Sequence, residues 1–217
     1  MLTTLESRSY LGPEQYALAD WRRTINDLYS QIRLMPDPEK AWKVWHGVRS
    51  DLYANHMMSP VPEKLQQNFV EIEVFDYDPG MRFYVGLEDA VHETLEYNLG
   101  DDGSSSIKRI AKTVGLADDL GAELDVFWIE GYGGGLFIPF KDESSGKETY
   151  GGGRYLVDAI KGSDLGLNSD GKLILDFNFS YNPSCSMSEK FVCPLAPPQN
   201  RIPVKVLAGE RLQSWVE

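Results

Sequence analysis

Short β-rich runs separated by turn residues recur from about residue 69 to residue 207, and they constrain the fold more than any other feature. Val70, Ile72 and Val74 alternate with glutamates, which is typical of a strand with one wet face. About eight such runs favour an antiparallel β-sandwich or open barrel over a βαβ array. The expected strands are Phe69–Phe75, Arg82–Val85, Ile107–Thr113, Leu124–Ile129, Leu136–Phe140, Tyr155–Ile160, Leu173–Phe177 and Val204–Leu207.

Two helices are expected before the strands. The first begins at Gly12-Pro13 and stops before Pro36, and its apolar residues recur at helical spacing: Leu18, Trp21, Ile25, Leu28 and Ile32. The second begins after an Asp37 N-cap and ends near Asn55, with an apolar stripe of Trp45, Val48 and Leu52.

This pattern predicts a mainly β, α+β chain without a linker that would divide it. Residues 1–62 are expected to form a helical N-terminal extension that packs on the body, and residues 63–217 a β-rich domain, the two making one structural unit. The polar segment Asp101–Ser106 is the best candidate for a mobile loop.

The charge balance excludes several classes of protein. The 217 residues include 21 Lys and Arg against 33 Asp and Glu, a formal net charge of −12 that disfavours nucleic acid and anionic membranes as partners. No run of about 18 apolar residues could span a membrane, and Met1–Arg8 lacks the pattern of a signal peptide. We therefore expect a cytoplasmic protein with reduced thiols; a homodimer stays open.

The most unusual residues lie between Gly131 and Glu210. The run Gly151-Gly152-Gly153 has no helix behind it that would make it a phosphate loop. Its glycines either allow a positive φ or close backbone approach, or form a floor beneath a small ligand, with Glu148, Tyr150 and Arg154 above it.

Arg154 has two interpretations of its own. It is either buried in a structural salt bridge or holds the carboxylate or phosphate of a ligand. The candidate partners for the salt bridge are Glu148, Asp158 and Asp176.

A polar row follows in the sequence. Strand alternation places Asp176, Asn178 and Ser180 on one face and two phenylalanines on the other. If the polar face points inward it lines a pocket, and Asn182-Pro183 then marks a turn.

Cys185 and Cys193 stand as C-x7-C and leave four alternatives open. They are structural thiols, a loop-closing disulfide, half of a metal site, or a catalytic nucleophile that would want a histidine partner in space. The spacing is poor for zinc, and none of the histidines is adjacent in sequence. We expect neither a metal nor a cofactor.

His56 follows the second predicted helix. It is either a capping or dipole partner of that helix or a general base.

Several of these motifs together resemble domain of unknown function family 1684. The likeness runs from about Lys40 to Glu210 and implies a bacterial or archaeal β-rich domain with a site at the motifs, but no reaction. The motifs that carry it are Arg49–Tyr53, His56–Pro60, Tyr150–Tyr155, Leu175–Asn178, Tyr181–Cys185, Cys193–Pro198 and Asn200-Arg201.

Two functional hypotheses follow. In the first, the motifs form a pocket for a small anionic molecule and the protein is a hydrolase or lyase. In the second, a non-catalytic binding or structural β domain uses the same residues as a core polar network. The first assigns catalysis to Glu148, Asp176 and His56, and ligand binding to Tyr150, Arg154, Asn178, Asn182 and Arg201.

Overall fold

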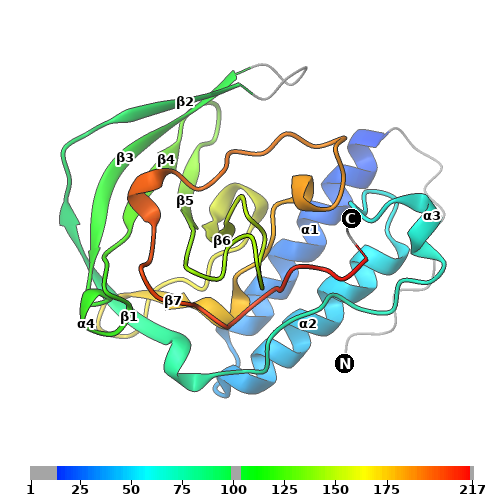
Figure 1. Ribbon diagram of the computed structural model, residues 1–217, viewed down its shortest axis with the longest axis horizontal. Coiled ribbons are helices and arrows are strands. Elements are labelled where there is room, and N and C mark those ends of the chain that lie inside the picture. The colour runs from blue at the N-terminus through cyan, green and yellow to red at the C-terminus, as the bar shows by residue number, and fades with distance from the viewer. Residues whose placement is uncertain (1–13, 99–103, 216–217) are drawn as a thin grey trace.

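A pair of long helices opens the described chain, which in the computed structural model covers residues 14–98 and 104–215 (Figure 1). Helix α1 spans Glu14–Arg33 and α2 spans Pro38–Asn55. The side chain of Asp37 accepts a hydrogen bond from the Lys40 N–H at 3.1 Å, as expected of an N-cap. Both helices were predicted, although the expected start at Gly12-Pro13 lies outside the described residues.

Within the described residues, seven strands form one antiparallel sheet. The strands are β1 (Arg82–Asp89), β2 (Thr94–Asn98), β3 (Ser104–Val114), β4 (Asp125–Ile129), β5 (Gly135–Phe140), β6 (Arg154–Asp158) and β7 (Leu173–Asp176). Short helical segments lie before, between and after the strands: α3 (Glu63–Gln66), η1 (Pro79–Met81), α4 (Ala117–Leu120), η3 (Ala159–Lys161), η4 (Phe177–Phe179), η5 (Ser184–Ser186) and η6 (Pro198–Asn200).

The sheet curls into a nearly closed barrel. Its strand order is β6-β5-β4-β3-β1-β7, and β2 lies beside the first half of β3. Past β7, Tyr181 exchanges two backbone hydrogen bonds with Tyr155 of β6, at 2.8 and 3.1 Å, which brings the two ends of the sheet together. The expected mainly β fold is confirmed in its open-barrel form, with two N-terminal helices.

The buried side chains form two cores because neighbouring residues of a strand point to opposite faces. Phe127 and Phe137 join a core with α1 and α2, built around Trp45. Their neighbours Val126 and Ile138 join a second core with the last segment of the chain. In Figure 1 the helices lie beside the barrel and against one side of it. No helix in the described ranges has the length and apolarity needed to cross a membrane.

Two of the expected strands are wrong. The segment Phe69–Phe75 makes only an isolated bridge at Val74, and Val70 is 84% exposed. The side-chain amide of Gln213 accepts from the Glu73 N–H and donates to the Glu73 carbonyl. Among the described residues, the backbone pairing with the last segment of the chain is limited to the bonds Arg211 N–H to Glu73 and Phe75 N–H to Gly209, which are too few to form a strand.

The expected strand Val204–Leu207 is likewise irregular, because its Val206 N–H bonds the Asp142 carboxylate at 2.7 Å instead of a neighbouring strand. Conversely, β2 was not expected. The predicted mobile loop Asp101–Ser106 lies partly outside the described residues, and its last three residues belong to β3.

Candidate functional site

Glu210 is the centre of a buried polar network near the family motifs. Its carboxylate accepts from Arg49 Nε at 3.0 Å and Nη2 at 2.6 Å with one oxygen. The other oxygen accepts from the Asn182 backbone N–H at 2.7 Å. The Glu210 and Arg49 side chains are 0% and 4% exposed, so helix α2 and the last segment of the chain are joined by a dry ion pair.

Aromatic rings enclose the Arg49 guanidinium. Its central carbon lies 4.5 Å from the centre of the Tyr181 ring, and the rings of Trp45 and Tyr53 lie 5.2 and 5.1 Å away. Burial is the largest single effect and opposes the charge, but Glu210, Tyr53 and Tyr29 together outweigh it and raise the pKa of Arg49. A buried, permanently charged group held in this way fixes the packing of α2 on the barrel.

Arg154 begins β6 and is 1% exposed. It donates to the carbonyls of Ala208 and of Val206, the latter at 2.8 Å, and lies 3.4 Å from an Asp142 oxygen. Burial lowers its pKa to about 10, despite the opposing effect of Asp142, so the guanidinium stays charged at neutral pH.

The expected salt-bridge partners of Arg154 are therefore wrong. Its acidic partner is Asp142, because Glu148, Asp158 and Asp176 each bond a different cation. Asp142 also accepts from the Ser144 hydroxyl at 2.6 Å.

Within the glycine run next to Arg154, backbone geometry requires the glycine at position 153. Gly153 has φ +94°, and a Cβ there would lie 2.5 Å from the Phe140 carbonyl oxygen. Gly151 carries neither constraint, since its φ is not positive and a Cβ there would lie 3.6 Å from its nearest neighbouring atom.

Asp176 and Asn178 form a second network. Asp176 accepts from Arg82 Nη1 and from the Asn178 side chain, both at 2.8 Å. The side-chain amide of Asn178 also makes two hydrogen bonds to the backbone of Asp78. Its oxygen accepts from the Asp78 N–H, and its nitrogen donates to the Asp78 carbonyl. Burial raises the pKa of Asp176, against the lowering effect of Arg82. The strand expected through these residues ends at Asp176, which instead caps the 3-10 turn η4.

The other predicted site residues lie in separate surroundings. Glu148 pairs with Lys205, which lowers its pKa, and Arg201 pairs with Glu143 at 2.8 Å on the surface. Tyr150 places its hydroxyl 3.9 Å from Cys185 Sγ. These three side chains thus contact neither the Glu210 network nor the Asp176 network in any hydrogen bond between described residues.

His56 is the C-cap residue of α2 and is 8% exposed. Its Nδ1 accepts from the Met58 N–H at 3.0 Å, which places the ring proton on Nε2, 3.6 Å from Asp20. The ring also packs edge-on against Trp21.

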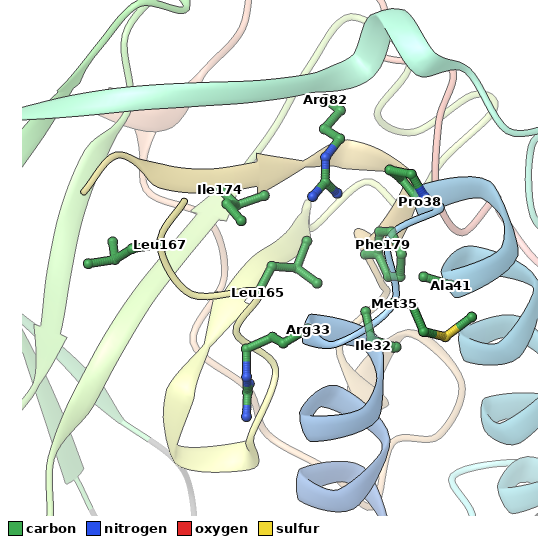
Figure 2. Close-up of a pocket in the computed structure, with 10 residues that line it drawn as sticks. All are labelled: Ile32, Arg33, Met35, Pro38, Ala41, Arg82, Leu165, Leu167, Ile174 and Phe179. Atoms are coloured by element: carbon green, nitrogen blue, oxygen red, sulfur yellow. The ribbon is translucent and has the colours of Figure 1, made fainter. Parts of the chain in front are cut away.

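A cavity of about 100 Å³ lies between the two long helices and the barrel (Figure 2). None of the eight predicted site residues lines it. The guanidinium of Arg82 points into it, whereas that of Arg33 turns away and donates to the Asp164 carbonyl at 2.7 Å. Its lining residues are Ile32, Arg33, Met35, Pro38, Ala41, Arg82, Leu165, Leu167, Ile174 and Phe179.

Sequence reasoning missed four charged residues that organise these sites: Arg49, Arg82, Asp142 and Glu210. For Arg49 a signal existed, because it lies four residues from both Trp45 and Tyr53 and therefore on the buried stripe of α2. The other three carry no local signal, since their partners are far away in the sequence or across a loop.

Comparisons with known proteins found a similar solved structure and a matching family model. A solution NMR structure of an uncharacterized protein from Haloarcula marismortui is similar over 80% of this chain and 93% of its own, with 28% sequence identity and a TM-score of 0.55. No curated protein matches. The family model described as protein of unknown function (DUF1684) matches residues 67–211, which leaves α1 and α2 outside the matched region. This chain belongs to the DUF1684 family, as the sequence motifs predicted.

Proposed function

We propose that this protein is a non-catalytic binding domain for a small anion with a short apolar tail, held in the cavity beside Arg82. In this proposal the family motifs supply the buried polar network that holds the barrel together. The single observation that carries it is the guanidinium of Arg82 pointing into an otherwise largely apolar cavity.

The hydrogen bonds of Arg82 support an anion at this place. Nη1 bonds Asp176 at 2.8 Å and Nε bonds the Tyr84 hydroxyl at 3.2 Å. No acceptor among the described residues takes a hydrogen bond from Nη2. A ligand carboxylate at the mouth of the cavity could accept a hydrogen bond from Nη2.

The size of the cavity limits the ligand. At about 100 Å³ it is smaller than the roughly 150 Å³ cavity that accommodates benzene in another protein. An alkyl group of about three to four carbons fits inside the cavity, with the carboxylate at its mouth against Arg82. A ligand this small binds weakly, and we expect a Kd of roughly 0.1–1 mM.

The lining favours binding over catalysis. The described residues around the cavity include no carboxylate, imidazole, hydroxyl or thiol that could act as acid, base or nucleophile. The nearby Asp176 carboxylate is occupied by Arg82 and Asn178.

Calorimetric titration tests the proposal. The ligands are isobutyrate and its uncharged counterpart isobutanol. We expect isobutyrate to bind and isobutanol to bind at least tenfold more weakly. Arg82→Lys should weaken isobutyrate binding severalfold while keeping a cation beside Asp176, and Ala41→Leu should abolish binding by filling the cavity.

Arg33→Lys is the matched control, because its guanidinium turns away from the cavity. The proposal fails if isobutyrate and isobutanol bind equally, if neither binds, or if Arg33→Lys weakens binding as much as Arg82→Lys.

A further inference from the structure

The Arg82 guanidinium beside the cavity is already paired with a carboxylate of the protein. Its Nη1 donates to Asp176 Oδ2 at 2.8 Å, and the side chains of Arg82 and Asp176 are 18% and 0% exposed. Among the described residues, Asp176 forms no other ion pair. One positive and one negative charge therefore balance each other before any ligand binds.

The remaining hydrogen bonds of the Asp176 carboxylate come from a neutral residue. Asn178 donates to Oδ1 with its backbone N–H at 3.0 Å and with its side-chain amide at 2.8 Å. A carboxyl group that takes up a proton keeps acceptor capacity beside its one new donor. Asp176 can therefore be protonated at Oδ2 while the bonds from Asn178 and Arg82 persist.

Two phenols and one further carboxylate lie on the barrel side of this pair. Tyr84 accepts from Arg82 Nε at 3.2 Å, and burial together with Asp176 raises the pKa of Tyr77 to about 12, so that phenol is neutral at physiological pH. The Asp78 side chain caps the turn η1. None of these three groups carries a positive charge that could balance a second anion.

The two helices contribute one carboxylate and one cation near the cavity. Glu39, in the first turn of α2, bonds Lys43 at 2.7 Å on the surface. Arg33, at the end of α1, is exposed, turns away from the cavity and donates to the Asp164 carbonyl at 2.7 Å. Water and salt screen such exposed charges. The cation that a ligand carboxylate meets at the mouth is thus Arg82.

We propose that the site takes up a proton on Asp176 together with each ligand carboxylate, so that binding of the anion is coupled to pH. The coupling rests on the proposed function, because it needs the ligand carboxylate to lie against Arg82. With the ligand on Nη2 and Asp176 on Nη1, one guanidinium faces two carboxylates. Two carboxylates that share one site resist being ionised together. The proton comes from solvent and is bound at Oδ2.

Burial decides which of the two carboxylates takes the proton. The ligand carboxylate lies at the mouth of the cavity, whereas the Asp176 side chain is 0% exposed. Burial already raises the pKa of Asp176, against the lowering effects of Arg82 and Asn178. A ligand anion raises that pKa further. Binding therefore weakens as the pH rises from the pKa of Asp176 in the free site to its pKa in the occupied site.

Calorimetric titration of the full chain with isobutyrate measures the coupling. The titrations are made at pH 5.5 and pH 7.5, in buffers that differ in ionisation enthalpy. Isobutyrate is mostly ionised at both, since ordinary carboxyl groups titrate at roughly pH 4–5. We expect a Kd about threefold or more lower at pH 5.5, which corresponds to an average uptake of about a quarter of a proton per ligand or more. Carbon NMR of the wild-type Asp176 carboxyl should show protonation at a higher pH when isobutyrate is present.

Two variants assign the proton to a residue. Asp176→Asn removes the charge and keeps the size of the side chain, so it should bind isobutyrate at pH 7.5 at least as tightly as wild type does at pH 5.5, with a Kd independent of pH. Glu39→Gln is the matched control, because Glu39 bonds Lys43 and not Arg82. It should keep the pH dependence of wild type. If Asp176→Asn does not fold, the wild-type proton uptake and carbon NMR decide.

The outcomes distinguish the coupling from the proposed function. Isobutyrate binding with equal Kd at both pH values and without proton uptake overturns the coupling and leaves the proposed function standing. The assignment to Asp176 is overturned if folded Asp176→Asn keeps the proton uptake or loses isobutyrate binding, or if Glu39→Gln abolishes the uptake. Absence of isobutyrate binding at either pH overturns the proposed function and the coupling with it.

Discussion

Substituting Glu210 tests whether the motif residues hold the fold together. Glu210→Gln keeps the shape and an acceptor for the Asn182 N–H, but it leaves the Arg49 cation buried without a counter-charge. Removing one partner of a buried ion pair costs about 3–5 kcal/mol, so we expect a loss of about 3 kcal/mol. Glu210→Ala should lose about 5 kcal/mol, because the Asn182 N–H is then orphaned as well.

Urea unfolding measures this loss. With a slope of about 2–3 kcal/mol/M, Glu210→Gln should lower the midpoint by about 1 M or slightly more. The double variant Arg49→Met/Glu210→Gln should lose less than the sum of the single losses, with a coupling of about 2 kcal/mol.

Arg201→Gln is the matched control, since Arg201 is 60% exposed in its pair with Glu143 and should cost less than about 0.5 kcal/mol. The reasoning is refuted if Glu210→Gln moves the midpoint no further than Arg201→Gln does.

Two further predictions concern stability. Gly153→Ala should lose about 2 kcal/mol or more in urea unfolding, because of its positive φ and the approach of the Phe140 carbonyl, whereas Gly151→Ala should stay within about 0.5 kcal/mol; equal losses would contradict this account. The pKa of Glu123 is lowered, since hydrogen bonds from Thr113 and three backbone N–H groups outweigh burial. Its contribution to stability is thus present above the unfolded pKa and lost as the pH falls through the lowered, folded pKa. Glu123→Gln should therefore be less stable than wild type by about 1 kcal/mol at pH 7, and the deficit should shrink as the pH falls below the unfolded pKa; a deficit independent of pH would refute this.

Local patterns predicted the parts of the fold that local physics decides. The helices followed from apolar spacing and the Asp37 cap, and the central strands from β-rich runs between turns. Phe69–Phe75 also alternates well, yet its backbone groups bond to scattered partners, among them the side chain of Gln213, 140 residues away from Glu73. The spacing of apolar residues within this segment does not indicate such distant partners.

In the candidate site, too, local sequence patterns did not predict which residues pair with each other. The sequence correctly marked Arg154 as a charge that burial would force into a partnership, but the partner, Asp142, lies twelve residues away across a loop. Arg49 and Glu210 are 161 residues apart, so only the folded chain reveals their pairing.

Methyl and backbone amide NMR spectra, recorded during titration with isobutyrate, test the central claim most directly. The claim is that the ligand occupies the helix–barrel cavity while the motif residues hold the fold. The account predicts saturable shifts at the methyl groups of Ile32, Leu165 and Ile174, with the Asn182 and Glu210 amide signals unchanged. Shifts confined to Asn182 and Glu210, or none at any of these groups up to about 10 mM isobutyrate, would contradict it.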